Sequence, residues 1–240
     1  MSRRILLLID PQLDFCEGGK LAVAGGNAAL EQVAELITSQ VRMWDDIVVT
    51  FDQHHQFHIG HPIYMRNSAG ENPQPFTVMV EKGGQLINGQ LDASGNMTEI
   101  GAMTCSVPSL TRWTTDYIRS LAANGRYRHM FWNPHCLIGT HGACMHPAIE
   151  KAIFQWELER VAMAVKVTKG SNYRTEHFGA VRSEVIDPKD SSTDVNIPLL
   201  NALEDEKSEL FVAGLARGHC LANTVVDAAI SLGDDRFYKR

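Results

Sequence analysis

Several segments of the sequence carry side chains that could act together in nucleophilic catalysis. Asp10 ends one short apolar run, Lys169 follows another, and Cys220 stands where an expected strand turns into a helix. The N-terminus of a helix stabilises a thiolate, and its free N–H groups can hold an oxyanion. A carboxylate can take the thiol proton, and a nearby ammonium group favours the thiolate. Asp10, Lys169 and Cys220 therefore form a candidate catalytic set, although each alone could be a capping, solvated or core residue.

A second group of side chains could bind a divalent metal ion. The segment 52–61 combines an aspartate with several histidines, namely Asp52, His54, His55, His58 and His61. His135 follows a different expected strand and could complete the set. Carboxylate and imidazole ligands suit Zn, Fe or Mn, and a mixed set leaves positions for water or substrate. The alternative is a surface loop that is merely rich in histidine.

The elements that must position these residues alternate between strands and helices. Residues 4–9 and 46–51 are rich in Leu, Ile and Val without alternation, which is typical of strands buried on both faces, and 27–44 has a helical period. A strand–helix–strand unit of this length implies parallel strands. Further strands are expected at 128–132, 161–167 and 209–213, and further helices at 109–123, 147–159, 199–206 and 218–232. This alternation predicts an α/β fold, a three-layer αβα sandwich with a mainly parallel sheet, whose ligand site lies at the carboxyl ends of the strands.

One long segment interrupts the alternation. Residues 63–126 contain a stretch rich in Gly, Asn, Ser and Pro, with a short strand expected at 76–80. We interpret this segment as a surface insertion within a single domain spanning 1–240, not as a second folded core. After the last expected helix no further strand follows, which predicts that the C-terminal end is truncated.

Composition narrows the function classes. The 240 residues are 44% hydrophobic and 21% charged, with a net charge of −6, which argues against a nucleic-acid or anionic-membrane partner. No apolar run approaches the roughly 20 residues that span a bilayer, and the N-terminus lacks the pattern of a signal peptide. Five irregularly spaced cysteines indicate reduced thiols and a cytoplasmic location. The insertion and an unfinished sheet edge favour a homo-oligomer.

The motifs resemble the nicotinamidase/pyrazinamidase branch of the isochorismatase-like cysteine hydrolases. They are DPQLDF (10–15), DQH (52–54), WNPHCLIGTHGA (132–143), KG (169–170) and GLARGHC (214–220). The match follows the chain in order from about residue 4 to 232 and leaves out the segment 63–126. The stretch at 132–143 is its most specific part.

The resemblance implies a hydrolase that cleaves a small amide, nicotinamide to nicotinate and ammonia, through a cysteine thioester. Asp10 would be the general base, Lys169 would stabilise the thiolate, and Cys220 would attack the amide carbon. The backbone N–H groups of Ala216 and Cys220 would form the oxyanion hole, with a cis peptide bond before Ala216.

The resemblance also implies a substrate pocket and one divalent metal ion (Zn, Fe or Mn). The substrate ring would lie near Phe15 and Trp132, with its ring nitrogen reaching the metal. The implied metal ligands are Asp52, His54, His58 and His135, with His61 as the alternative to His58.

Some positions around the expected pocket depart from the family pattern. Gln53 stands where the family often has Trp, Asn133 separates Trp from Pro, and Arg217-Gly218 replaces Thr-Asp. These differences leave open a related cysteine hydrolase of another amide, carbamoyl or ureido compound. A non-catalytic αβα binding module is the alternative from a different class. An isochorismatase-type vinyl ether hydrolase is disfavoured by the metal loop.

Overall fold

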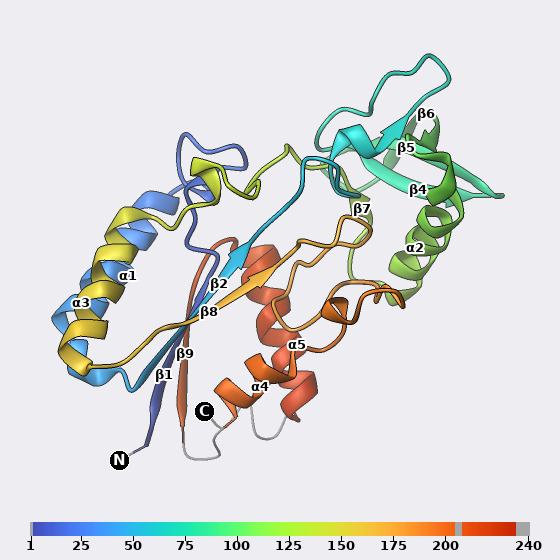
Figure 1. Ribbon diagram of the computed structural model, residues 1–240. Helices are drawn as coiled ribbons and strands as arrows, with labels where there is room; N and C mark the ends of the chain where they lie inside the picture. The colour runs from blue at the N-terminus through green and yellow to red at the C-terminus, as the bar shows by residue number, and fades with distance from the viewer. Residues whose placement is uncertain (1, 205–207, 234–240) are drawn as a thin grey trace.

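The computed structural model describes residues 2–204 and 208–233, whose elements form two sheets and their covering helices (Figure 1). The strands are β1 (Arg4–Ile9), β2 (Asp46–Asp52), β3 (Met65–Arg66), β4 (Val78–Lys82), β5 (Gln85–Leu91), β6 (Met97–Cys105), β7 (His129–Met130), β8 (Val165–Lys169) and β9 (Glu209–Gly214). The α-helices are α1 (Gly26–Ser39), α2 (Thr111–Asn124), α3 (Pro147–Arg160), α4 (Ile197–Leu203) and α5 (Ala222–Leu232).

The first sheet is parallel and has the order β8-β2-β1-β9 within the described residues. Strand β1 lies in the middle, where Leu8 pairs with Val49 of β2 on one side and with Ala213 of β9 on the other. Each residue from Ile5 to Ile9 is at most 1% exposed. A strand covered on both faces needs apolar side chains at every position, which explains the unbroken run in its sequence.

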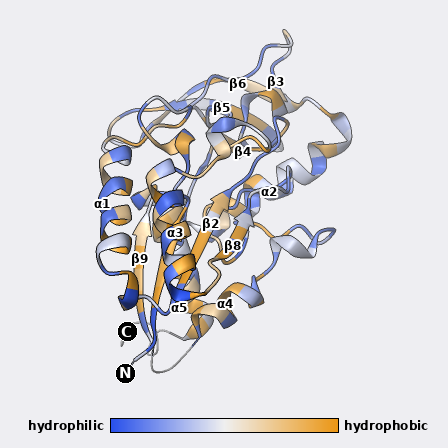
Figure 2. Cartoon of the chain, turned by 60° about the vertical axis from the view of Figure 1, so that its left-hand side comes forward, coloured by the Kyte–Doolittle hydropathy of each residue, from blue (hydrophilic) through white to orange (hydrophobic). Residues whose placement is uncertain are grey.

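Helices cover both faces of the parallel sheet. On one face α1 and α3 pack through residues such as Leu30, Ile37 and Trp156, and on the other α4 and α5 pack through Leu203 and Leu232. The central strands are coloured hydrophobic, whereas α1 carries many hydrophilic residues (Figure 2). The expected three-layer α/β fold with a parallel sheet is confirmed.

Residues 65–130 build a second sheet, which the sequence analysis did not anticipate. Its strands pair antiparallel in the order β3-β6-β5-β4-β7, and α2 packs against it. It has a core of its own: Ile59, Tyr64, Met65, Met79, Leu86, Met103, Cys105, Tyr117, Ile118, Leu121 and Phe131. The expectation that 63–126 lacks a folded core was therefore wrong. So was the assignment of 128–132 to the parallel sheet, because β7 pairs antiparallel with β4.

Several other boundaries differ from expectation by a few residues. Helix α1 ends at Ser39, well before residue 44, and β8 begins at Val165 and not at residue 161. The last helix is preceded by a separate five-residue π-helical turn, Arg217–Leu221, in which Leu221 N–H donates to Ala216 O. The expected truncation concerns residues 234–240, and the expected end of α4 concerns 205–206; both lie outside the described residues.

The helices of the described residues are short or polar compared with a membrane span. Within residues 2–204 and 208–233, none is both long and apolar enough to cross a bilayer.

Candidate active site

The four key side chains lie at the carboxyl edge of the parallel sheet. Asp10 directly follows β1, Asp52 ends β2, Lys169 ends β8, and Cys220 lies in the turn after β9. Because parallel strands end at a common edge, residues far apart in the sequence meet there. All four are buried, with exposed fractions between 0 and 6%.

The structure brings Asp10, Lys169 and Cys220 into one cluster. Lys169 Nζ lies 3.0 Å from Asp10 Oδ2 and 3.8 Å from Cys220 Sγ. It also donates to Asp52 Oδ1 at 2.9 Å and to the carbonyl oxygen of His177 at 3.0 Å. Asp10 Oδ1 accepts a hydrogen bond from Thr50 Oγ1 at 2.6 Å, which fixes the carboxylate plane. The ammonium group is therefore surrounded by the acceptors that a buried cation requires.

The pKa shifts separate the roles of these groups. Burial raises the pKa of Cys220 well above its usual range, although Lys169 opposes this, so the resting group is a thiol that needs a base. Burial also raises the pKa of Asp10, which the Lys169 charge offsets in part. Burial alone would lower the pKa of Lys169, but Asp10 and Asp52 raise it well above its usual range. Lys169 therefore stays charged, and Asp10 is the carboxylate suited to exchange a proton.

Two motif residues hold the surrounding loops together. The Gln12 side chain donates to the carbonyl oxygens of Asp52 (2.7 Å) and Ala143 (3.0 Å), and accepts from the N–H of Asp52 at 2.7 Å. Asp14 Oδ2 accepts from the N–H of Cys136 at 2.6 Å. A Cβ added to Gly142 would lie 2.2 Å from Asp14 Oδ2, so a larger residue there would displace the Asp14 carboxylate. The motifs at 10–15 and 132–143 thus depend on each other.

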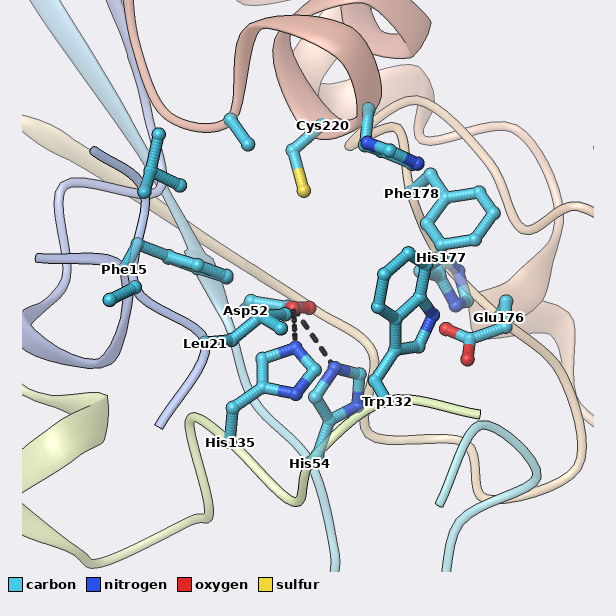
Figure 3. A pocket seen from close by; sticks show the side chains of 14 residues that line it. Phe15, Leu21, Asp52, His54, Trp132, His135, Glu176, His177, Phe178 and Cys220 are labelled. Carbon is cyan, nitrogen blue, oxygen red and sulfur yellow. Dashed lines mark hydrogen bonds and ion pairs between the residues drawn. The ribbon is translucent and has the colours of Figure 1, made fainter. Parts of the chain in front are cut away.

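A compact set of possible metal ligands lies beside the catalytic cluster. Asp52, His54 and His135 offer ligand atoms that all lie within 4.8 Å of one another. Asp52 Oδ2 lies 2.9 Å from His54 Nε2 and 3.4 Å from His135 Nε2 (Figure 3). The opposite nitrogens, Nδ1, face the carbonyl oxygens of Gly170 and Asn133 at 3.0 and 2.7 Å. A carbonyl only accepts, so each Nδ1 donates to it, and with an ion bound each Nε2 would offer its lone pair to that ion, as in metal sites. These residues fit a divalent ion.

His58 and His61 also lie beside His54, with ring centroids 4.4 and 5.4 Å from its ring. Their hydrogen bonds differ. His61 Nδ1 faces the carbonyl oxygen of Gln56 at 3.2 Å, which leaves a lone pair on Nε2, whereas His58 Nδ1 accepts from the N–H of Gly60 at 3.1 Å. Burial lowers the pKa of His58 well below its usual value and that of His61 to about 3, so both rings are neutral. The Nδ1 lone pair of a neutral His58 is therefore used by Gly60, whereas His61 keeps a lone pair on Nε2.

A cavity of about 190 Å³ opens onto both groups. Phe15 and Trp132 line it, as expected, and Cys220 Sγ points into it (Figure 3). Further lining residues were not expected from the sequence and come from two loops and from the turn beside Cys220: Leu21, Ala22, Val23, Glu176, His177, Phe178 and His219. Glu176 and His177 follow Lys169 on the same loop, so their closeness to this lysine in the sequence could have identified them.

The nucleophile turn has the expected backbone. The Leu215–Ala216 peptide bond is cis, and both Ala216 and Cys220 line the cavity. Gly214 has φ 130°, and a Cβ there would lie 2.1 Å from the carbonyl oxygen of Ile9, so the close approach of β9 to β1 requires glycine. This geometry can deliver a thiol, a base and backbone donors to one carbonyl carbon.

Comparisons with known proteins agree with this site. No family model matches the sequence. The nicotinamidase/pyrazinamidase of Mycobacterium tuberculosis is 26% identical over 227 residues, 94% of this chain and 78% of that protein. The nicotinamidase of Escherichia coli is 25% identical over 228 residues, 95% and 77% of the two chains. The structure of the yeast nicotinamidase bound to the inhibitor nicotinaldehyde superposes with a TM-score of 0.60 at 19% identity, covering 95% of this chain and 82% of that one.

The chain shares the α/β fold of the solved yeast nicotinamidase, and its site holds the thiol, carboxylate and ammonium groups that a cysteine hydrolase requires. The sequence relatives, which are named nicotinamidases, agree with the resemblance found in the motifs.

Proposed function

We propose that this chain is an amide hydrolase that converts nicotinamide to nicotinate and ammonia through a thioester on Cys220. One observation carries the proposal: the sulfur of Cys220, Lys169 Nζ and Asp10 Oδ2 form one buried cluster at the wall of an aromatic cavity. The sequence relatives named nicotinamidase support the choice of substrate.

The chain's own groups account for both half-reactions. Asp10 takes the thiol proton as Cys220 Sγ attacks the amide carbon, and the N–H groups of Ala216 and Cys220 hold the resulting oxyanion. Asp10 then gives the proton to the amide nitrogen, the C–N bond breaks and ammonia leaves. For hydrolysis Asp10 takes a proton from water, whose oxygen attacks the thioester, and returns it to the departing sulfur. Lys169 balances the negative charge throughout.

Asp52, His54 and His135 would hold one divalent ion, and we propose His61 in place of His58 as the third imidazole ligand. Neither Nε2 has a hydrogen-bond partner among the described residues, and the reason for choosing His61 is that its Nδ1 faces the carbonyl oxygen of Gln56, which leaves the lone pair on Nε2. When bound, the ion would supply a Lewis acid that orients a ring nitrogen of the substrate. Phe15 and Trp132 would hold the ring between them.

The decisive experiment measures ammonia released from nicotinamide by the wild type, Cys220→Ala and Cys144→Ala. Cys144 is an exposed thiol and serves as the matched control. We expect Cys220→Ala to keep the thermal melt of the wild type and to lose turnover, while Cys144→Ala keeps both. Activity in Cys220→Ala would refute the mechanism.

Two alternatives remain distinguishable. A panel of other amides, carbamoyl and ureido compounds with the same ammonia readout tests a related hydrolase. A binding module would release ammonia from none of them. We also infer a cytoplasmic enzyme with reduced thiols and a homo-oligomeric state, the latter measurable by light scattering.

A further inference from the structure

The turn that carries the nucleophile is held from outside the parallel sheet. Tyr127 lies just after α2, and its hydroxyl donates to the carbonyl oxygen of Gly218 at 3.1 Å. Its ring stacks on that of His219, with centroids 5.4 Å apart and an interplanar angle of 23°. The two residues that precede Cys220 are thus both in contact with one tyrosine.

Asn223 connects this tyrosine to the backbone of the turn. Its Nδ2 donates to the carbonyl oxygen of His219 at 2.9 Å and to the Tyr127 hydroxyl at 3.0 Å. Its Oδ1 accepts from the Arg126 guanidinium, which also pairs with the buried Asp227 at 2.9 Å. Both ends of the amide are occupied, so its orientation is fixed.

The peptide group that accepts the hydrogen bond from Asn223 also carries the backbone N–H of the nucleophile. The carbonyl of His219 and the N–H of Cys220 belong to the same planar peptide group, so holding the oxygen sets the direction of the N–H. The backbone N–H of Ala222 donates to the same carbonyl, which completes its hydrogen bonding. The Cys220 N–H is a proposed oxyanion donor, and such donors act by being aimed before the charge develops.

We propose that Asn223, fixed by Tyr127 and Arg126, is a positioning residue that aims the Cys220 N–H at the developing oxyanion. The proposal rests on the proposed amidase function and gives a positioning role to the segment between α2 and β7, which contains Arg126 and Tyr127. That segment belongs to the antiparallel part of the molecule, so the oxyanion hole depends on both sheets.

The test compares Asn223→Leu and Tyr127→Phe with the matched control Tyr64→Phe. The control removes the buried Tyr64 hydroxyl, whose hydrogen bond is with Thr114 in the second core and not with a residue of the turn. Loss of a whole oxyanion donor lowers kcat about a hundredfold or more, and a misaligned donor should cost less. We therefore expect kcat to fall about tenfold or more in Asn223→Leu and about threefold to tenfold in Tyr127→Phe. KM for nicotinamide should stay within about twofold, and Tyr64→Phe should keep the wild-type kcat.

Inhibition by nicotinaldehyde separates positioning from a structural role. When its carbonyl carbon bonds to Cys220 Sγ, the thiol proton passes to Asp10 and the carbonyl oxygen takes the electron pair in the oxyanion position. We expect both variants to bind the aldehyde more weakly by the factor lost in kcat, and to bind nicotinate as the wild type does. Wild-type aldehyde affinity in both variants would overturn the proposal. A wild type that releases no ammonia from nicotinamide would instead refute the proposed function.

Discussion

Lys169 Nζ lies 2.9 Å from Asp52 Oδ1 and joins the histidine cluster to the thiol and carboxylate of the catalytic cluster. Asp10 and Asp52 thus share one ammonium group, yet their pKa values shift in opposite directions. Burial prevails at Asp10 and raises its pKa, whereas His54 and Lys169 overcome burial at Asp52 and hold its pKa well below the usual range. Asp52 is therefore the permanent anion of the pair, and Asp10 the one that can be protonated.

Replacing Lys169 should damage both stability and activity. Lys169→Met leaves two buried carboxylates without their ammonium partner, and breaking a buried ion pair from one side costs about 3–5 kcal/mol. We expect a loss of this order in the free energy of unfolding, measured by urea denaturation, and no detectable amide hydrolysis. Lys166→Met removes an exposed lysine from the same strand and should change neither quantity. A Lys169→Met protein as stable as the wild type would contradict this account of the ion pair.

Replacing Thr50 should shift the acid limb of the pH–rate profile. Asp10 must be ionised to act as a base, so kcat/KM falls as the pH drops through its pKa. The hydrogen bond from Thr50 Oγ1 lowers that pKa, and Thr50→Val removes it. A hydrogen bond to a charged group corresponds to about one pH unit, so the acid limb should move up by about that amount at saturating metal. Thr168→Val, an exposed site on β8, should leave the limb in place; a shift in the control alone would point to another group.

Replacing Glu176 should change KM at alkaline pH. Burial and the nearby Asp52 raise the pKa of Glu176 to about 8, so its carboxyl is neutral at pH 7 and ionises as the pH rises through that value. Ionisation adds a negative charge to the cavity wall, and substrate binding should weaken. Glu176→Gln stays neutral, so we expect its KM to match the wild type at pH 7 and to be the lower of the two at pH 9. Parallel KM profiles for the two proteins would disprove this role.

Metal content should distinguish His61 from His58. His61→Ala removes an Nε2 lone pair and should lower metal affinity by at least about tenfold, as second-shell losses alone do. His58→Ala and the exposed control His55→Ala should bind metal as the wild type does. Metal per chain after dialysis against a graded chelator gives the comparison. Equal losses in His58→Ala and His61→Ala would show that both imidazoles contribute.

The parallel sheet could be predicted because each of its strands is encoded locally. The run from Ile5 to Ile9 is buried on both faces and therefore apolar throughout. The second sheet is different. Strands β4 and β5 are joined by a tight turn at Gly83 and Gly84, both with positive φ, and in the sequence such glycines are also typical of an irregular loop. Its core joins Met65 to Tyr117, residues whose contact depends on tertiary folding.

The same reasoning applies to the site. The strand-end residues Asp10 and Lys169 could be found because topology alone brings them together. The choice between His58 and His61 could not be made from spacing, because it depends on the backbone partners Gly60 and Gln56. Tyr127 escaped notice because its contact with Gly218 spans 91 residues.

The hydrogen bonds around Trp132 tie the pocket to the antiparallel sheet. Phe131 N–H donates to the carbonyl oxygen of Thr77 at 2.9 Å, and Trp132 N–H donates to that of Gly60 at 2.8 Å. If the smaller core opens first, the chain leading to Trp132 and His135 is released with it, so inactivation would precede global denaturation. A ligand that binds both His135 and Asp52 stabilises the closed state and so opposes that opening. With such a ligand bound, the two cores should unfold together as one cooperative unit.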